Sequence, residues 1–150
     1  MKPLIVLLLS FTISLFVIKI TQKEYDLFLS ARISISIMFL FTAIGHFIYT
    51  KGMSMMIPSA IPYKETLVHL TGVFEILVAI SILIPKMKEI SGWIFIIFLL
   101  LMLPANIYAA INNVNFQKGT FNGNGITYLW FRIPLQIFFI LWIYLSSIKY

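Results

Sequence analysis

The chain has 150 residues, of which 61% are hydrophobic and only 11% are charged, and its mean hydropathy is +1.00. A soluble domain of this length needs far more polar surface, so the composition predicts a single integral membrane domain. The formal net charge of +6 does not indicate a nucleic-acid-binding protein. The basic residues stand singly or in pairs at the ends of apolar segments, as membrane-flanking residues do.

Five apolar stretches are each long enough to cross a bilayer as a helix, which takes about 20 residues for ~30 Å of hydrocarbon. They do not alternate between apolar and polar residues, as the strands of a transmembrane barrel do. The sequence therefore predicts an all-α transmembrane bundle with four core helices and an additional N-terminal helix. The expected helices cover residues 3–20, 29–50, 65–84, 90–110 and 126–148.

The first stretch follows Lys2 and resembles a signal peptide, but residues 18–23 lack the small-x-small pattern of a cleavage site. We therefore expect a retained transmembrane helix. Residues 51–63 are apolar but contain Pro58 and Pro62, which a continuous helix does not accommodate. We expect this segment to form an interfacial or re-entrant cap on the bundle. Residues 85–89 predict a tight turn between antiparallel helices, and the glycines and asparagines of residues 112–125 predict a turn-rich loop.

A set of polar residues interrupts these apolar segments. Ionisable groups in hydrocarbon are costly, so they persist mainly where they pair, line a cavity or carry out chemistry. When the helices are followed back and forth across the membrane, the whole set falls in the half of the bilayer that carries the cap. The sequence thus predicts a polar, ligand-binding cluster on the cap side. Its members are His46, His69, Glu75, Asn106, Arg132 and Gln136.

Glu75 lies about ten residues into its expected helix, near the middle of the bilayer. It is either a proton-handling group or ligand anchor, or one half of a structural ion pair. Arg132 is its expected partner, because a guanidinium group can hold a carboxylate through two hydrogen bonds. The alternative for Arg132 is that its side chain extends to the nearby membrane interface.

His46 and His69 together with Glu75 suggest a metal site, but their spacing matches no metal-binding motif. In addition, His69 lies about 120° around its helix from Glu75. Axial haem ligation by the two histidines is disfavoured further, because both would have to reach the same height in the bundle. We expect the histidines to form hydrogen bonds between helices, and Asn106 either to do the same or to donate to a ligand.

Five short segments, in this order along the chain, resemble the DoxX family of small bacterial membrane proteins. They are FTAIGHF at 41–47, MIPSAIP at 56–62, TGVFE at 71–75, LPANI at 103–107 and LWFRIPLQ at 129–136. The resemblance implies a four-helix bundle that crosses the bacterial inner membrane several times. The family takes its name from a subunit of a thiosulfate:quinone oxidoreductase, so it also implies a role in a redox complex. The additional helix at residues 3–20 departs from the four-helix pattern.

The chain carries no recognisable nucleophile–base arrangement, phosphate-binding loop, zinc-protease motif or dinucleotide fingerprint. Without cysteine it cannot supply thiolate metal ligands or thiol-disulfide catalysis, although an organic cofactor or a partner could still give it a redox role. We expect at most a subunit of a membrane oxidoreductase, lying in the lipid bilayer beside a redox partner protein and binding a small, partly apolar molecule such as a quinone. The alternatives are a proton-coupled carrier and a purely structural membrane protein. Assembly into an oligomer stays open.

Overall fold

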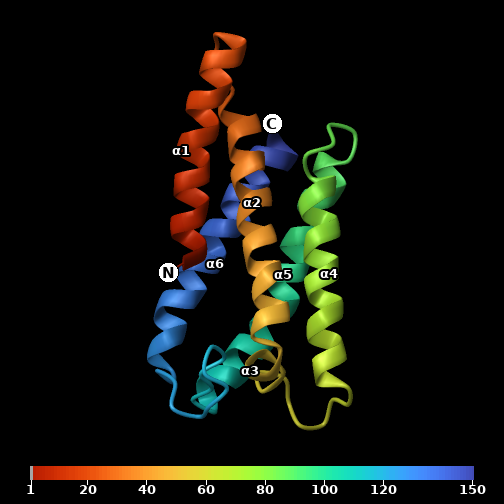
Figure 1. Ribbon diagram of the computed structural model, residues 1–150, viewed down its shortest axis with the longest axis vertical. Coiled ribbons are helices and arrows are strands. Elements are labelled where there is room, and N and C mark those ends of the chain that lie inside the picture. Colours follow the sequence, from red (N-terminus) through yellow and green to blue (C-terminus); the bar gives the residue numbers. More distant parts are fainter. Residues whose placement is uncertain (1) are drawn as a thin grey trace.

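The computed structural model describes residues 2–150, which form six α-helices and no extended strand (Figure 1). The prediction of an all-α bundle is confirmed. The helices are α1 (Lys2–Gln22), α2 (Leu27–Ile48), α3 (Thr50–Ser54), α4 (Lys64–Ser81), α5 (Lys88–Ile111) and α6 (Thr127–Ile143), and α6 continues into a π-helical segment, η1 (Tyr144–Lys149).

Four helices are long and apolar enough to span a membrane: α1, α2, α5, and α6 together with η1. The chain is therefore a multi-pass membrane protein. The sequence predicted a fifth spanning helix at residues 65–84, but α4 does not belong to this group. It has 18 residues, or about 27 Å of helix at 1.5 Å per residue, and it carries Lys64, Glu65 and Glu75. It ends at Ser81 rather than at residue 84, because the chain turns ahead of Pro85.

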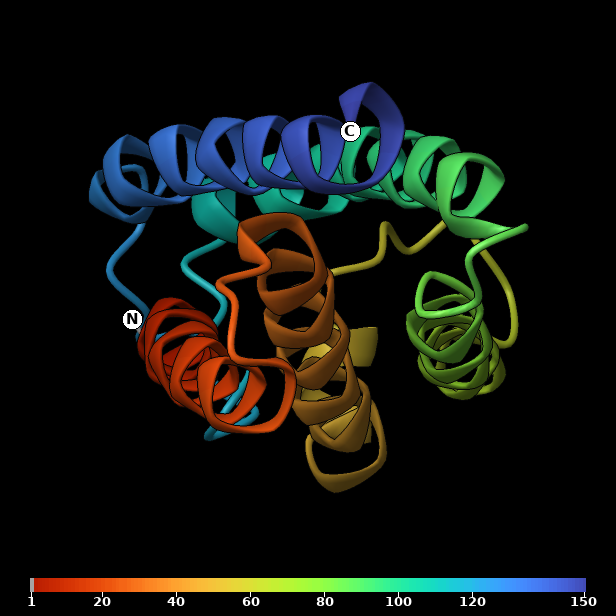
Figure 2. The same ribbon diagram turned by 90° about the horizontal axis from the view of Figure 1, so that it is seen from above.

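The helices form two layers. Seen from above, α5 and α6 lie side by side in one layer, and α1, α2 and α4 make up the other (Figure 2). Within the second layer α2 is central and packs against both α1 and α4. The N-terminal end of α1 lies near mid-height, and the opposite end projects beyond the rest of the bundle (Figure 1). The additional helix is therefore offset along the bundle axis.

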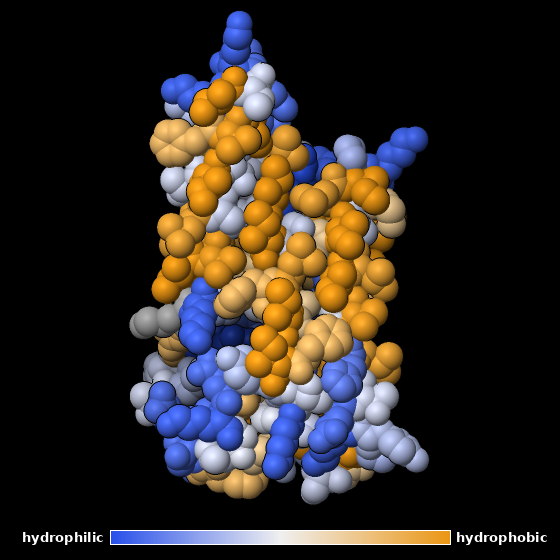
Figure 3. All heavy atoms as spheres, viewed as in Figure 1, coloured by the Kyte–Doolittle hydropathy of each residue, from blue (hydrophilic) through white to orange (hydrophobic). Residues whose placement is uncertain are grey.

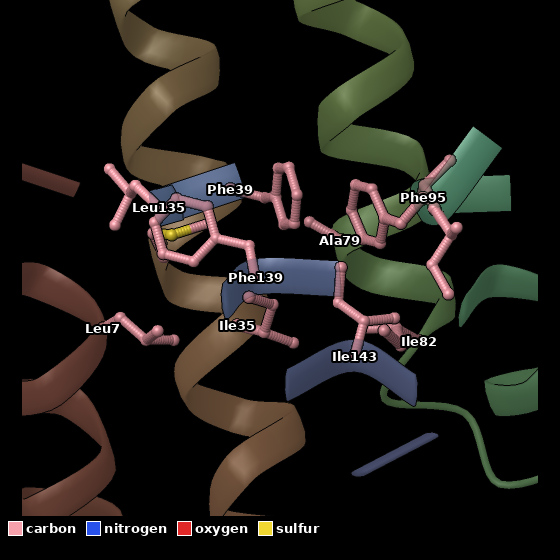
Figure 4. Packing of buried hydrophobic residues seen from close by; sticks show 12 residues of the cluster. Leu7, Ile35, Phe39, Ala79, Ile82, Phe95, Leu135, Phe139 and Ile143 are labelled. Carbon is pink, nitrogen blue, oxygen red and sulfur yellow. The ribbon is translucent and has the colours of Figure 1, made fainter. Parts of the chain in front are cut away.

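Apolar side chains from both layers meet in the core of the bundle (Figure 4). Phe39 of α2 stacks on Phe95 of α5 with ring centroids 3.8 Å apart, and Ala79 of α4 is fully buried in the same cluster. Leu135 and Phe139 of α6 also belong to this core, and both line the cavity described below. The core therefore forms the inner wall of that cavity.

The segment between α2 and α4 begins with the short helix α3 and continues in turns through Pro58 and Pro62. Gly52 in α3 is buried against the loop that joins α5 to α6, and a Cβ atom there would overlap the backbone carbonyl oxygen of Phe116. Only glycine permits this contact. The cap segment and the α5–α6 loop are therefore docked onto each other at one end of the bundle.

Candidate ligand-binding site

A cavity of about 400 Å³ lies in the cap-side half of the bundle. Its wall is formed by residues of α2, α4, α5 and α6, and the cap segment contributes Met53, Met56, Ile57, Pro58 and Ile61. Most of these side chains are apolar, with a small number of polar groups among them. Pockets that bind small molecules have this volume and this lining.

The structure brings five of the six predicted site residues together around this cavity: His46, Glu75, Asn106, Arg132 and Gln136. His69 does not line it. Its side chain is exposed, its Nε2 lies 3.1 Å from Oγ1 of Thr50, and its ring stacks on Phe47. Six residues of helix turn it about 120° away from Glu75, so it faces outward from the polar cluster.

Glu75 and His46 form the ionisable centre of the site. Nδ1 of His46 lies 3.1 Å from the carbonyl oxygen of Val68, which can only accept, so this nitrogen is assigned the hydrogen. Nε2 then faces Oε1 of Glu75 at 3.5 Å, an ion-pair distance. A single proton on either of these two atoms prevents two lone pairs from facing each other. The pair thus places an imidazole and a carboxyl group, between which a proton can be exchanged, at the cavity wall.

Two threonines that were not among the predicted site residues complete this arrangement. Thr42 donates to Oε2 of Glu75 at 3.0 Å, and Oγ1 of Thr71 lies 3.0 Å from Nδ1 of His46. Each threonine therefore contacts the ionisable residue of the opposite helix. The signal in the sequence was spacing, since Thr42 precedes His46 by four residues and Thr71 precedes Glu75 by four.

The expected ion pair between Glu75 and Arg132 is not formed, and that prediction was wrong. Among residues 2–150 the structure contains one ion pair, and it joins Glu75 to His46. The cause is the close packing of α4 on α2: a Cβ atom on Gly72 would lie only 2.9 Å from Cβ of His46. Glu75 follows Gly72 by less than one turn, so its carboxylate meets α2 before it can reach α6.

The two amide side chains each use one donor on a backbone carbonyl. Nδ2 of Asn106 donates to Met102 O at 2.9 Å within its own helix, and so does not bridge two helices as one interpretation expected. Nε2 of Gln136 donates to Leu99 O at 2.5 Å and ties α6 to α5. Each amide has a second hydrogen and a carbonyl oxygen beyond these bonds, and these can serve a ligand.

No three His, Cys, Asp or Glu side chains gather into a potential metal site within the described part of the chain. The cavity thus offers one imidazole, one carboxylate, two amides, one guanidinium group and the hydroxyl of Thr71 in a largely apolar surround. Such a set can hydrogen-bond a ligand and exchange a proton with it.

Residues 35–147 match the family described as Domain of unknown function (DUF8561). The chain belongs to the DUF8561 family. The matched region begins inside α2 and ends inside η1, so it contains every wall of the cavity and leaves α1 outside. No curated protein and no solved structure matches the chain. The description of DUF8561 assigns no activity, so the function has to be argued from the site.

Proposed function

We propose that this DUF8561 protein is a non-catalytic membrane subunit that binds a small, partly apolar molecule, with a quinone as the best candidate. The observation that carries the proposal is the cavity of about 400 Å³ in which six polar residues from four helices, Thr71 and the five predicted ones, line one largely apolar wall. These residues lie far apart in the sequence, and a membrane interior tolerates such groups mainly where they pair or serve a function. The resemblance to the DoxX family supports a bacterial inner-membrane location and a quinone-linked redox system.

The lining suits a quinone for two reasons. Its apolar residues, including Phe98 and Leu135, can enclose a ring and the start of an isoprenoid chain. Arg132 and the second amide hydrogens of Asn106 and Gln136 are donors for the ring oxygens. The His46–Glu75 pair can accept the proton of a hydroxyl group when the reduced form is bound. Electron transfer belongs to a partner oxidoreductase, since this chain carries no thiolate and no recognised catalytic motif.

The test is retention of small molecules by the purified protein, with co-purifying proteins scored by mass spectrometry. The protein is solubilised gently from its native membrane, and the extracted lipids are compared between variants. We expect Arg132→Leu and Glu75→Leu to lose the retained molecule, and His69→Leu to keep it. His69 is a matched control because it shares α4 with Glu75 but lies outside the cavity. Equal retention by Arg132→Leu, Glu75→Leu and the wild type would remove the cavity from the function.

A proton-coupled carrier is the second candidate, because the imidazole of His46 and the carboxyl group of Glu75 lie 3.5 Å apart in the wall of a cavity. In this case Glu75 releases and takes up a proton in each transport cycle. Purified protein in liposomes would then move its substrate with a rate that depends on Glu75. Flux through Glu75→Gln equal to that of the wild type would exclude the carrier and leave the binding subunit as the proposal.

A further inference from the structure

A second cavity, of about 290 Å³, lies beside the first. It is bounded by the N-terminal end of α1, the C-terminal end of α5, the α5–α6 loop and the first turns of α6. Met56 and Arg132 line both cavities, so the two spaces are neighbours separated by these side chains. The polar residues of the second cavity include Asn115, Gln117 and Asn124 from the loop.

The second cavity is positively charged. Lys2 and Arg132 both line it, and no aspartate or glutamate does. Arg132 makes no ion pair and no side-chain hydrogen bond with any residue from 2 to 150. Every fully buried side-chain nitrogen of residues 2–150 has a hydrogen-bond partner. The guanidinium nitrogens of Arg132 have none, so they are not fully buried, and Arg132 lines both cavities. A cation next to an apolar cavity and without a protein carboxylate is a binding group for an external anion.

The position of this cavity along the bundle also points to an amphipathic ligand. The surface is hollowed beside the N-terminal end of α1, and the inside of the hollow is hydrophilic (Figure 3). The hollow lies where the hydrophobic band of the surface gives way to a hydrophilic region (Figure 3). In a bilayer this boundary corresponds to the level of the lipid headgroups.

We propose that the two cavities form one site for a single-chain amphipath with an anionic head. The head group lies between Lys2 and Arg132 in the second cavity, and phosphate is the anionic group best suited to these two cations. The chain passes Met56 and occupies the apolar cavity. A quinone has no anionic head, so the amphipath and a quinone are alternative occupants of the first cavity. The inference rests on the proposed function only in requiring that this cavity binds an apolar molecule.

The test compares two lipids with the same chain but different heads, oleoyl lysophosphatidate and monooleoylglycerol. Binding to the full chain in a non-ionic detergent is followed by native mass spectrometry, with any affinity tag at the C-terminus so that Lys2 is undisturbed. We expect the wild type to prefer lysophosphatidate by about tenfold or more, as charge-assisted hydrogen bonds to one phosphate provide. Lys2→Gln and Arg132→Gln should each lower this preference, while Lys118→Gln should not. Lys118 lies on the same loop but lines neither cavity.

Lys2→Gln is the decisive variant, because Lys2 lines the second cavity and not the first. Lys2 is also exposed at a helix end, where its replacement does not threaten folding. Equal affinity of the wild type for both lipids, or an unchanged preference in Lys2→Gln, overturns the bipartite site and leaves the retention of a quinone untouched. Stabilisation by inorganic phosphate without binding of lysophosphatidate assigns a soluble anion and also overturns it. A different result, in which the purified wild-type protein retains no small molecule at all, would refute the proposed function itself.

Discussion

The contact between α2 and α4 predicts that two glycines in this region respond in opposite directions to the same substitution. A Cβ atom on Gly72 of α4 would lie 2.9 Å from Cβ of His46 and 3.2 Å from the ring of Phe47. On Gly45 of α2 the nearest atom would be Cε of Met53 at 3.7 Å, an ordinary contact. Both glycines are inside helices and neither has a positive φ.

The expected magnitudes follow from these distances. Replacing glycine by alanine inside a helix stabilises the fold by about 0.5–1 kcal/mol, because alanine loses less conformational freedom. Gly45→Ala should therefore raise the free energy of unfolding by about that amount. At Gly72 the same gain is opposed by overpacking of about 1–3 kcal/mol. The Cβ of His46 is fixed to the backbone and cannot rotate away, so α4 itself has to move. Gly72→Ala should lie about 1–3 kcal/mol below Gly45→Ala.

The assay is a titration of the purified protein from a mild detergent into SDS, followed by the fluorescence of its three tryptophans. Dyes that react with thiols cannot report unfolding here, because the chain has no cysteine. The two variants differ by one methyl group each and serve as controls for each other. A Gly72→Ala protein as stable as Gly45→Ala, or more stable, would refute the close approach of α2 and α4 and with it the explanation for the His46–Glu75 pair.

Three other predictions concern single contacts that hold the helices and the cap together. Glu75→Leu alone leaves Nε2 of a neutral His46 without a partner and should cost about 1–3 kcal/mol, while the double variant His46→Leu/Glu75→Leu should recover part of this loss; no recovery would contradict the pairing. Gly52→Ala should separate the cap from the carbonyl of Phe116 and make the cap more sensitive to limited proteolysis, and a digestion pattern like that of the wild type would count against the docking. Gln136→Leu removes one hydrogen bond between α6 and α5 and should lower stability by about 0.6–1.7 kcal/mol in the SDS titration, so a loss several times larger would indicate a further role for this residue.

Five of the six predicted residues line the cavity, because depth in a membrane follows from counting, whereas the direction in which a residue such as His69 faces does not. A helix rises about 1.5 Å per residue and successive helices reverse direction. His46 near the end of one helix and Arg132 near the start of another therefore had to be at similar heights. Asn106 followed from the same argument for α5. These relative heights do not depend on whether the N-terminal helix spans the membrane or on the exact helix ends, because they follow from the alternation of the later helices.

The partner of Glu75 in the ion pair could not be predicted in the same way, because it depends on the rotation of each helix and on the distance between helix axes. Arg132 and Glu75 have suitable heights and opposite charges, and charge alone favoured them as partners. The contact at Gly72 brings α4 so close to α2 that His46 reaches the carboxylate first. The second cavity was missed for a related reason. It joins Lys2 to a loop more than 100 residues away in the sequence, and nothing local in either segment indicates that contact.

The polar residues of the cap-side half fall into two groups, and the difference between them bears on the function. Glu75, Asn106 and Gln136 each have a partner within the protein, so a purely structural bundle would also account for them. Arg132 has no such partner in the described chain, and it stands between an apolar cavity and a cationic one. An arginine that only stabilised the bundle would be expected to meet a carboxylate or a carbonyl of the protein. One that only extended to the membrane interface would not be expected to line the apolar cavity as well. Arg132 is therefore the residue that most favours a ligand over a structural role, and its replacement should affect binding more than folding.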